Sequence, residues 1–321
     1  MKPLIGNEKK PLVILTGPTA VGKTDLSLQL ARAVEGEIVS ADSMQVYRHM
    51  DIGSAKILPE ERQGIPHHLI DCRDPWEEFH VVEFQREAKA AMEKIWSRGH
   101  LPLVTGGTGF YIQALLRDID FTETGGNPAY REALEKKASE EGPEALHARL
   151  AQVDPEAARQ IHPHNVKRVI RALEYFHDTG EPISVHNERE RKRQSPYHYA
   201  YFVLNRNRPE LYRRIDARVD QMMEAGLLEE VRRLRQMGCT RQMVSMQGLG
   251  YQELLEYLDG ELSLEAAVEK IKRETRHYAK RQITWFKREP DVIWLDREKY
   301  PGTEDLLAVI LEECRKRGII A

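Results

Sequence analysis

The 321-residue chain has little cysteine: only Cys72, Cys239 and Cys314, which lie far apart in the sequence. An odd, scattered set of thiols fits neither a disulfide framework nor a zinc-binding pattern, and it is typical of a reducing compartment. No apolar run approaches the length needed to cross a membrane, and residues 1–8 lack the apolar core of a signal peptide. We therefore expect a cytoplasmic protein with no membrane partner.

The chain also has little net charge, −3 at pH 7, so nucleic-acid binding cannot be argued from the total. Two segments are nevertheless locally basic. Residues 186–218 contain nine Lys or Arg against four Asp or Glu, and residues 270–288 contain eight against one. Concentrated positive charge on a near-neutral protein suits a polyanionic partner. The alternative is that both segments are solvated helix faces.

One glycine-rich segment matches the P-loop pattern G-x-x-x-x-G-K-[ST] at every position: Gly17, Pro18, Thr19, Ala20, Val21, Gly22, Lys23 and Thr24. It follows the apolar run 11–15 and opens the helical pattern 25–31, which is the order that a phosphate cradle requires. Lys23 can reach an outer phosphate, and the Thr24 hydroxyl can hold Mg²⁺. The alternative is a chance glycine-rich turn. The motif predicts a bound di- or triphosphate, but it does not say that a phosphate is transferred.

The pattern of apolar runs predicts an α/β fold. Short strands are expected at 12–15, 37–40, 68–70 and 101–105, with a helix at 82–92 before the last of them. Such alternation favours a parallel sheet with helices on both faces. A strand signal returns at 199–204, followed by long helices near 209–237 and 264–287, a strand at 292–295 and a helix at 304–316.

Between the strands expected at 101–105 and 199–204, the sequence predicts helices. Four prolines separate these helices: Pro143, Pro155, Pro163 and Pro182. We therefore expect a P-loop NTPase-like parallel sheet core with an inserted all-helical domain. The predicted divisions are 1–120 for the first part of the core, 121–198 for the insertion and 199–321 for the second part of the core. The pair Gly125-Gly126 is either a hinge or a loose loop.

Two further segments are expected at the P-loop edge of the sheet, because ligands bind at the carboxyl ends of parallel strands. Asp42, Ser43, Met44 and Gln45 follow the second strand, and Asp42 could bind Mg²⁺ or remove a proton. Alternatively, Asp42 and Ser43 cap the next helix. Thr108 lies in the glycine-rich turn 106–109 after a later strand, where close approach to a ligand is possible.

Arg214 and Arg218 are four residues apart, so one helix face presents both guanidinium groups. Together they could clamp a phosphate. They could equally form surface ion pairs with Asp216 or Asp220, which would contribute little.

The ordered combination of these motifs resembles the bacterial tRNA dimethylallyltransferase family, from about residue 11 to residue 295. The matching segments are 17–24, 42–47, 50–56, 67–71, 106–111, 165–174, 248–251 and 275–285. The resemblance implies transfer of a dimethylallyl group from dimethylallyl diphosphate to N6 of the adenosine that is 3′-adjacent to the anticodon. The P-loop would hold the diphosphate leaving group.

The resemblance also implies roles for individual residues. Asp42 would accept the proton of the amine, while Lys23, Arg218 and Thr24 with Mg²⁺ would stabilise the diphosphate. The residues expected to contact tRNA are Asp42, Ser43, Met44, Gln45, Thr108, Val166, Lys167, Arg168, Val169, Ile170, Arg171, Arg281 and Gln282. The expected partners are tRNA, through its anticodon stem-loop, and dimethylallyl diphosphate, and the expected oligomeric state is a monomer.

Three other functions fit parts of the sequence. The P-loop alone would suit a kinase of small metabolites, but that reading leaves the basic segments and the helical insertion unexplained. A prenyltransferase acting on free adenylate would share the phosphate cradle. A nucleic-acid-binding NTPase switch would require nucleotide-dependent RNA affinity without group transfer.

Overall fold

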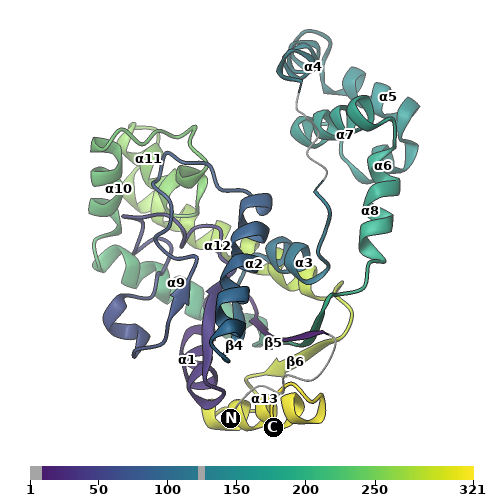
Figure 1. Cartoon of the computed structure of the whole chain (residues 1–321). Helices are drawn as coiled ribbons and strands as arrows, with labels where there is room; N and C mark the ends of the chain where they lie inside the picture. The colour runs from purple at the N-terminus through teal and green to yellow at the C-terminus, as the bar shows by residue number, and fades with distance from the viewer. Residues whose placement is uncertain (1–8, 122–126) are drawn as a thin grey trace. The chain divides into compact units, whose positions relative to one another are not determined.

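The structure is a computed structural model that describes residues 9–121 and 127–321 (Figure 1). The chain divides into two compact units, one formed by residues 1–116 and 196–321 and the other by residues 117–195. The sequence placed the inserted domain at 121–198. The observed divisions differ by a few residues because helix α3 (Gly109–Leu116) ends at 116 and strand β5 (Tyr197–Asn205) begins at 197. The expected hinge at Gly125-Gly126 lies outside the described residues.

The first unit is built on one six-stranded sheet in which every pairing is parallel, in the order β3-β2-β4-β1-β5-β6. The remaining strands are β1 (Lys10–Thr16), β2 (Gly36–Ser40), β3 (His67–His68), β4 (Leu101–Gly106) and β6 (Val292–Asp296). The α/β prediction is confirmed. Because all six strands point the same way, the loops that follow them gather at one edge.

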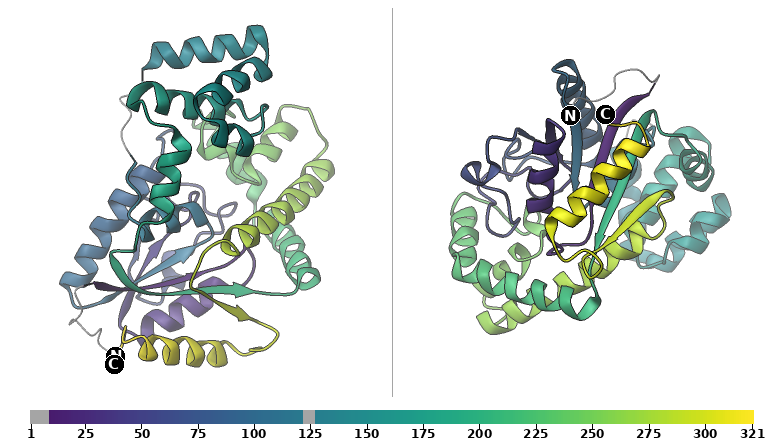
Figure 2. Two further views of the ribbon diagram at one scale, coloured as in Figure 1. Left: turned by 90° about the vertical axis from the view of Figure 1, so that its right-hand side faces the viewer. Right: turned by 90° about the horizontal axis from the view of Figure 1, so that it is seen from below.

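Helices cover both faces of this sheet, as its near-continuous apolar strands require. Val13 and Leu15 belong to a core shared with α1 (Lys23–Ala33) and α13 (Thr303–Lys316), which pack against each other on one face (Figure 2). The alternate residues Leu12 and Ile14 are also buried. Helix α2 (Val81–Ser97) packs against β2 and β4.

Two predicted elements of this unit are wrong in detail. The helix expected over 209–237 is two helices, α9 (Arg208–Glu224) and α10 (Leu227–Gln236), because Gly226 takes φ +97° between them. The strand expected at 68–70 is confined to His67–His68, because Leu69 and Asp71 both have positive φ and turn the chain away. Helix α12 (Leu264–Phe286) is close to its prediction, whereas α11 (Tyr251–Leu258) was not predicted.

Among its described residues the second unit contains helices and no strand. Its helices are α4 (Pro128–Glu141), α5 (Pro143–Val153), α6 (Pro155–Gln160), α7 (Val166–Thr179) and α8 (Ile183–Arg191). Three of them begin at a proline, which is favourable in the first turn. Buried Asp154 ties the unit together by accepting hydrogen bonds from the backbone N–H groups of Ala157 and Ser184.

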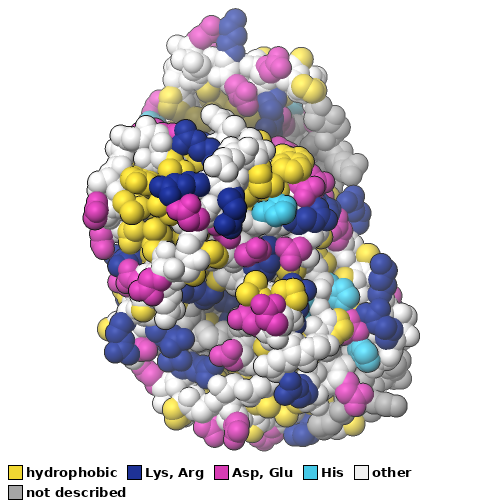
Figure 3. Space-filling model, turned by 90° about the vertical axis from the view of Figure 1, so that its left-hand side faces the viewer, with side chains coloured by type: hydrophobic (Ala, Val, Ile, Leu, Met, Phe, Trp, Pro, Cys, Tyr) yellow, Lys and Arg dark blue, Asp and Glu magenta, His cyan; other side chains and the backbone are white. Residues whose placement is uncertain are grey.

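Figure 3 looks onto the side of the first unit where α10 and α11 lie, and there the basic and acidic side chains are interspersed. Ion pairs account for this mixture: Arg232 with Glu229, Arg235 with Asp259, and Arg241 with Glu261. Among the described residues, no helix combines the length and apolar character needed to cross a bilayer.

Candidate active site

The P-loop lies at the carboxyl end of β1, where Gly17 and Gly22 set its shape. Gly17 has φ +149°, and a Cβ at this position would lie 2.6 Å from the carbonyl oxygen of Leu204. Gly22 has φ +95° and immediately precedes α1. Both positions therefore require glycine. The resulting loop runs directly into a helix N-terminus, which is the arrangement that binds phosphate.

Lys23 reaches back across this loop. Its Nζ donates hydrogen bonds to the carbonyl oxygens of Gly17 at 3.0 Å and Pro18 at 2.9 Å. Burial lowers the pKa of Lys23 to about 8, nearby Asp42 opposes that shift, and Arg218 adds to it. The ammonium group thus lies in a poorly solvated place where an anion would be a favourable neighbour.

Asp42 follows β2 and faces the same cavity as Lys23 and Arg218. Its Oδ1 accepts hydrogen bonds from the backbone N–H groups of Met44 at 2.9 Å and Gln45 at 3.4 Å. The expected helix cap is not found, because residues 42–50 form turns and no helix, and Oδ1 stabilises the first of these turns instead. Within the described chain Oδ2 forms no hydrogen bond, so the same carboxylate retains an oxygen that can accept a proton.

The glycine-rich turn 106–109 packs directly on the segment that follows β2. A Cβ on Gly106 would lie 2.2 Å from the carbonyl oxygen of Ala41, so only glycine fits there. The Thr108 hydroxyl accepts a hydrogen bond from the Ser43 N–H at 3.2 Å. The sequence had placed both turns on one edge of the sheet, and the structure brings them into contact.

Gln282 lies elsewhere than the sequence suggested. This α12 residue was expected at the tRNA surface, but it is buried between two glycine-rich turns. Its Oε1 accepts from the Thr19 N–H at 2.9 Å, and its Nε2 donates to the Gly107 carbonyl at 2.9 Å. Its amide is therefore committed to holding the turns together, although the side chain also lines the cavity.

The cavity lining contains two chemically different sets of residues, which are called its two walls below. One is cationic and hydroxylic, formed by Lys23, Thr24 and Arg218. Burial lowers the pKa of the Arg218 guanidinium, and Asp42 opposes the shift. The other wall contains Ile38, Ile57, Ile70 and Ala55. A ligand with an anionic head and a small apolar group fits this division.

Arg214 does not form the surface ion pairs that were considered for it. Asp216 pairs with Arg276 and Asp220 pairs with Lys272, while Arg214 Nε donates to the Ala20 carbonyl at 3.0 Å. Arg218, one turn further along α9, is the member of the pair that lines the cavity.

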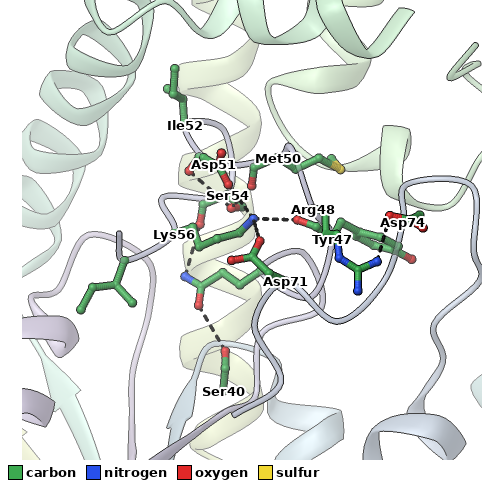
Figure 4. A network of polar contacts seen from close by, with 12 residues as sticks. Ser40, Tyr47, Arg48, Met50, Asp51, Ile52, Ser54, Lys56, Asp71 and Asp74 are labelled. Carbon is green, nitrogen blue, oxygen red and sulfur yellow. Dashed lines mark hydrogen bonds and ion pairs between the residues drawn. The ribbon is translucent and has the colours of Figure 1, made fainter. Parts of the chain in front are cut away.

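A polar network supports the segment beside Gln45 (Figure 4). At its centre, buried Lys56 donates to the Tyr47 carbonyl at 2.7 Å and to Asp51 and Asp71 at 2.6 Å each. The Gln45 amide accepts from the Ser40 hydroxyl at 3.2 Å and donates to the Ala55 carbonyl at 3.3 Å. The Gln45 side chain lines the cavity, and Ser43 and Met44 are half-buried beside it.

Glu230 organises the same segment, although no pattern in the sequence pointed to it. This buried α10 residue accepts hydrogen bonds from the backbone N–H groups of Asp51, Ile52 and Gly53, and from the Tyr251 hydroxyl at 2.7 Å. A glutamate within a helical pattern reads as surface charge, so no local signal could have identified it.

The residues expected to contact tRNA on α7 divide into two groups. Lys167, Arg168 and Arg171 are exposed. Val169 and Ile170 are buried in the core of the helical unit, and Val166 packs against that core. Contacts to tRNA through the side chains of Val169 and Ile170 are therefore excluded, because these side chains hold α7 in place.

The basic stretch of α12 also divides. In its first half Lys270, Lys272, Arg273 and Arg276 all pair with carboxylates. In its second half Lys280 and Arg281, and just beyond it Lys287 and Arg288, are exposed and form no ion pair with a described residue. These four cations are available to a polyanion.

Known proteins resemble this chain over most of its length. The IPP transferase family model matches residues 45–289, and an isopentenyl transferase model matches residues 10–77. A tRNA dimethylallyltransferase from Lachnoclostridium phytofermentans is 58% identical over 97% of this chain and 99% of its own length. The one from Bacillus velezensis is 51% identical over 90% and 92%.

Solved structures of similar proteins come from the same family. The tRNA isopentenylpyrophosphate transferase of Bacillus halodurans is 43% identical, with a TM-score of 0.72 over 96% of this chain and 98% of that one. A eukaryotic dimethylallyltransferase captured acting on tRNA is 31% identical, with a TM-score of 0.82 over 95% and 79%.

Proposed function

This chain belongs to the IPP transferase family, and from that premise we propose that it transfers a dimethylallyl group from dimethylallyl diphosphate to N6 of the adenosine 3′-adjacent to the anticodon in tRNA, releasing diphosphate. The observation that carries the proposal is the composition of one cavity lining, which combines P-loop residues, Asp42 and a set of isoleucines. An allylic diphosphate has both the anionic head and the small apolar group that these walls accommodate.

The cationic wall acts on the leaving group. As the allylic C–O bond breaks, negative charge accumulates on the diphosphate. The P-loop N–H groups, Lys23 and Arg218 stabilise that charge, and such preorganised electrostatics is usually the largest contribution to catalysis. Lys23 exchanges its hydrogen bonds to Gly17 and Pro18 for the ligand when the diphosphate binds.

Mg²⁺ fits the same wall. The Thr24 hydroxyl lines the cavity beside Lys23, and Mg²⁺ typically takes one or two protein oxygens together with phosphate oxygens and water. Bound there, the ion would neutralise charge on the diphosphate. The described residues hold no cluster of three or more His, Cys, Asp or Glu suited to a metal, so Thr24 and the ligand's own oxygens are the donors we propose.

Asp42 serves as the base. Its Oδ1 is held by the turn at Met44 and Gln45, which aims the second oxygen. The exocyclic amine of adenine is a weak nucleophile, and a positioned base contributes about 10²–10⁴-fold. The adenosine leaves its stack to reach the cavity, as bases do in other base-modifying enzymes.

Each of the two units has exposed cations that can bind the RNA. Lys167, Arg168 and Arg171 offer phosphate contacts on the helical unit, and Arg281 with its neighbours does so on α12. Phosphate contacts of this kind set orientation and make affinity depend on salt. We also propose a monomer acting in the cytoplasm, a reducing setting that suits three free thiols.

One incubation tests the function. The purified chain, Mg²⁺ and dimethylallyl diphosphate are mixed with an unmodified anticodon stem-loop, and parallel tubes offer AMP, or ATP with small metabolites. Nucleoside mass spectrometry should show one dimethylallyl group on the loop adenosine and none on AMP. Modified AMP would support an adenylate prenyltransferase instead, and consumption of ATP without modified RNA would support a kinase.

A further inference from the structure

Three successive carbonyl groups of the P-loop each accept a hydrogen bond from a different arginine. Arg214 Nε donates to Ala20 O at 3.0 Å, Arg206 Nε to Val21 O at 3.4 Å, and Arg297 Nη2 to Gly22 O at 3.2 Å. Of the three, only Arg214 lies on a helix that the sequence had associated with phosphate binding.

The sheet topology explains how these arginines converge. Arg206 directly follows β5 and Arg297 directly follows β6, which are the two strands beyond β1 in the sheet order. The Arg297 N–H donates to the Asn205 carbonyl at 3.0 Å, and the Asn205 side chain donates to Asp296 at 2.9 Å, so the two strand ends are joined. Parallel strands end at one edge, and both guanidinium groups therefore reach the loop that follows β1.

The three arginines form no close ion pair within the described chain. None of Arg206, Arg214 and Arg297 forms an ion pair with a carboxylate of the described chain. Burial lowers the pKa of Arg206 and of Arg297, and Arg214 lowers both further. Glu210 opposes the shift of Arg206, and Asp25 opposes that of Arg297. Arg297 also keeps a buried Nε with no hydrogen-bond partner. Arg297 is buried, Arg206 is half-buried and Arg214 is exposed. Like charges gathered at one loop repel one another, so an anion bound there would be a favourable neighbour.

We propose that Arg206, Arg214 and Arg297 are positioning residues for the anion site of the P-loop: they hold the carbonyls of Ala20, Val21 and Gly22 outward and supply positive charge behind the loop. Because C=O and N–H point in opposite directions in a peptide group, holding these oxygens outward turns the following N–H groups toward the ligand. The inference rests on the proposed function only in naming diphosphate as the ligand.

The expected effect is on diphosphate affinity. Arg214→Gln removes a charge-assisted hydrogen bond and should weaken binding of inorganic pyrophosphate with Mg²⁺ about tenfold. In turnover, KM for the allylic diphosphate should rise while KM for RNA stays unchanged. Arg214→Lys keeps the charge but loses the Nε geometry, so its affinity should fall between those of wild type and Arg214→Gln.

Isothermal titration of the full chain with pyrophosphate and Mg²⁺ tests this. Arg213→Gln is the matched control, because it removes the same charge from the neighbouring position of α9, where the side chain pairs with Glu210 and not with the P-loop. Equal affinities of Arg214→Gln and Arg213→Gln would overturn the proposal, as would a wild-type chain that does not bind pyrophosphate.

A second pair of variants keeps the test decisive if Arg214→Gln does not fold. Arg206→Gln, compared with the exposed Arg208→Gln, should show the same contrast even if Arg214→Gln does not fold. Thermal unfolding without ligand identifies folded variants. Because pyrophosphate binding needs no transfer, a wild-type chain that binds it but modifies no RNA would refute the proposed function and leave this inference standing.

Discussion

The side-chain Oε1 of Gln282 accepts a hydrogen bond from the backbone N–H of Thr19 at 2.9 Å, although 263 positions separate the two residues. The P-loop is therefore held by a helix from the far end of the chain as well as by its own glycines. The same amide reaches Gly107, so one side chain sets the spacing of two turns.

Gln282→Leu should destabilise the fold, because the Thr19 N–H and the Gly107 C=O lose their partner in a buried place. Each unsatisfied group costs about 1–3 kcal/mol, so a drop of that order in the free energy of unfolding is expected by urea denaturation. Gln236→Leu, at an exposed position of α10, is the control. Equal stabilities of the two variants would contradict a structural role for Gln282.

Asp42→Asn should separate the two roles of this residue. Asparagine keeps an oxygen that can accept from Met44 and Gln45 but cannot take up the proton of the amine. We expect transfer to fall about 10²–10⁴-fold in single-turnover assays, with RNA affinity largely intact. Asp42→Ala should abolish transfer and also lose the turn. Near-normal turnover of Asp42→Asn would show that the carboxylate only stabilises the turn.

Diphosphate affinity should depend on pH through Lys23. Its pKa is lowered to about 8 by burial, whereas a bound anion favours the ammonium form. Below pH 8 the side chain is already charged, so affinity should be constant there. Above pH 8 binding must take up a proton, and affinity should fall up to about tenfold per pH unit. Titration of Lys23→Arg isolates this effect, since arginine stays charged throughout and the ligand's own ionisation is common to both.

Glu37 should make the fold sensitive to acid. This β2 side chain is buried, which raises its pKa, but hydrogen bonds from Arg98, His68 and His100 outweigh burial and lower the pKa to about 2. The contribution of Glu37 to the free energy of unfolding is complete above pH 4.5, the ordinary pKa of glutamate. It is lost as the pH falls toward 2, the pKa in the folded protein.

The partners of Glu37 are partly exposed, so the contribution is about 1–2 kcal/mol after solvent screening. Denaturation of wild type and Glu37→Gln at pH 6 and at pH 3 measures it. The stability gap should narrow at pH 3, while exposed Glu93→Gln should show no gap at either pH. A gap that is the same at both pH values would exclude this linkage.

Arg281→Ala should weaken tRNA binding and reduce its dependence on salt. The side chain is exposed on α12, where its guanidinium lies 5.8 Å from the Tyr278 ring centroid. Loss of one phosphate contact lowers the slope of log K against log salt by about 1. Arg273→Ala, whose guanidinium is already paired with Glu274, should leave the slope unchanged. If both variants have the wild-type slope, Arg281 is not at the interface.

Some errors of sequence interpretation could have been avoided. Val169 and Ile170 share the buried face of α7 with Ala172 and Leu173, and that helical spacing is visible in the sequence. Treating the whole segment as an RNA contact ignored the periodicity. The break between α9 and α10 at Gly226 likewise followed from a residue that favours positive φ.

The sequence by itself determined the P-loop, the parallel α/β core and the helical insertion, because each is encoded by contiguous residues: glycine spacing, apolar periodicity and prolines at helix starts. Only the tertiary structure decided which side chains serve the loop. Arg206, Arg297 and Gln282 meet it because β5, β6 and α12 come together at the carboxyl edge of β1. That convergence depends on strand order and helix packing over hundreds of positions, for which no local pattern of residues carries a signal.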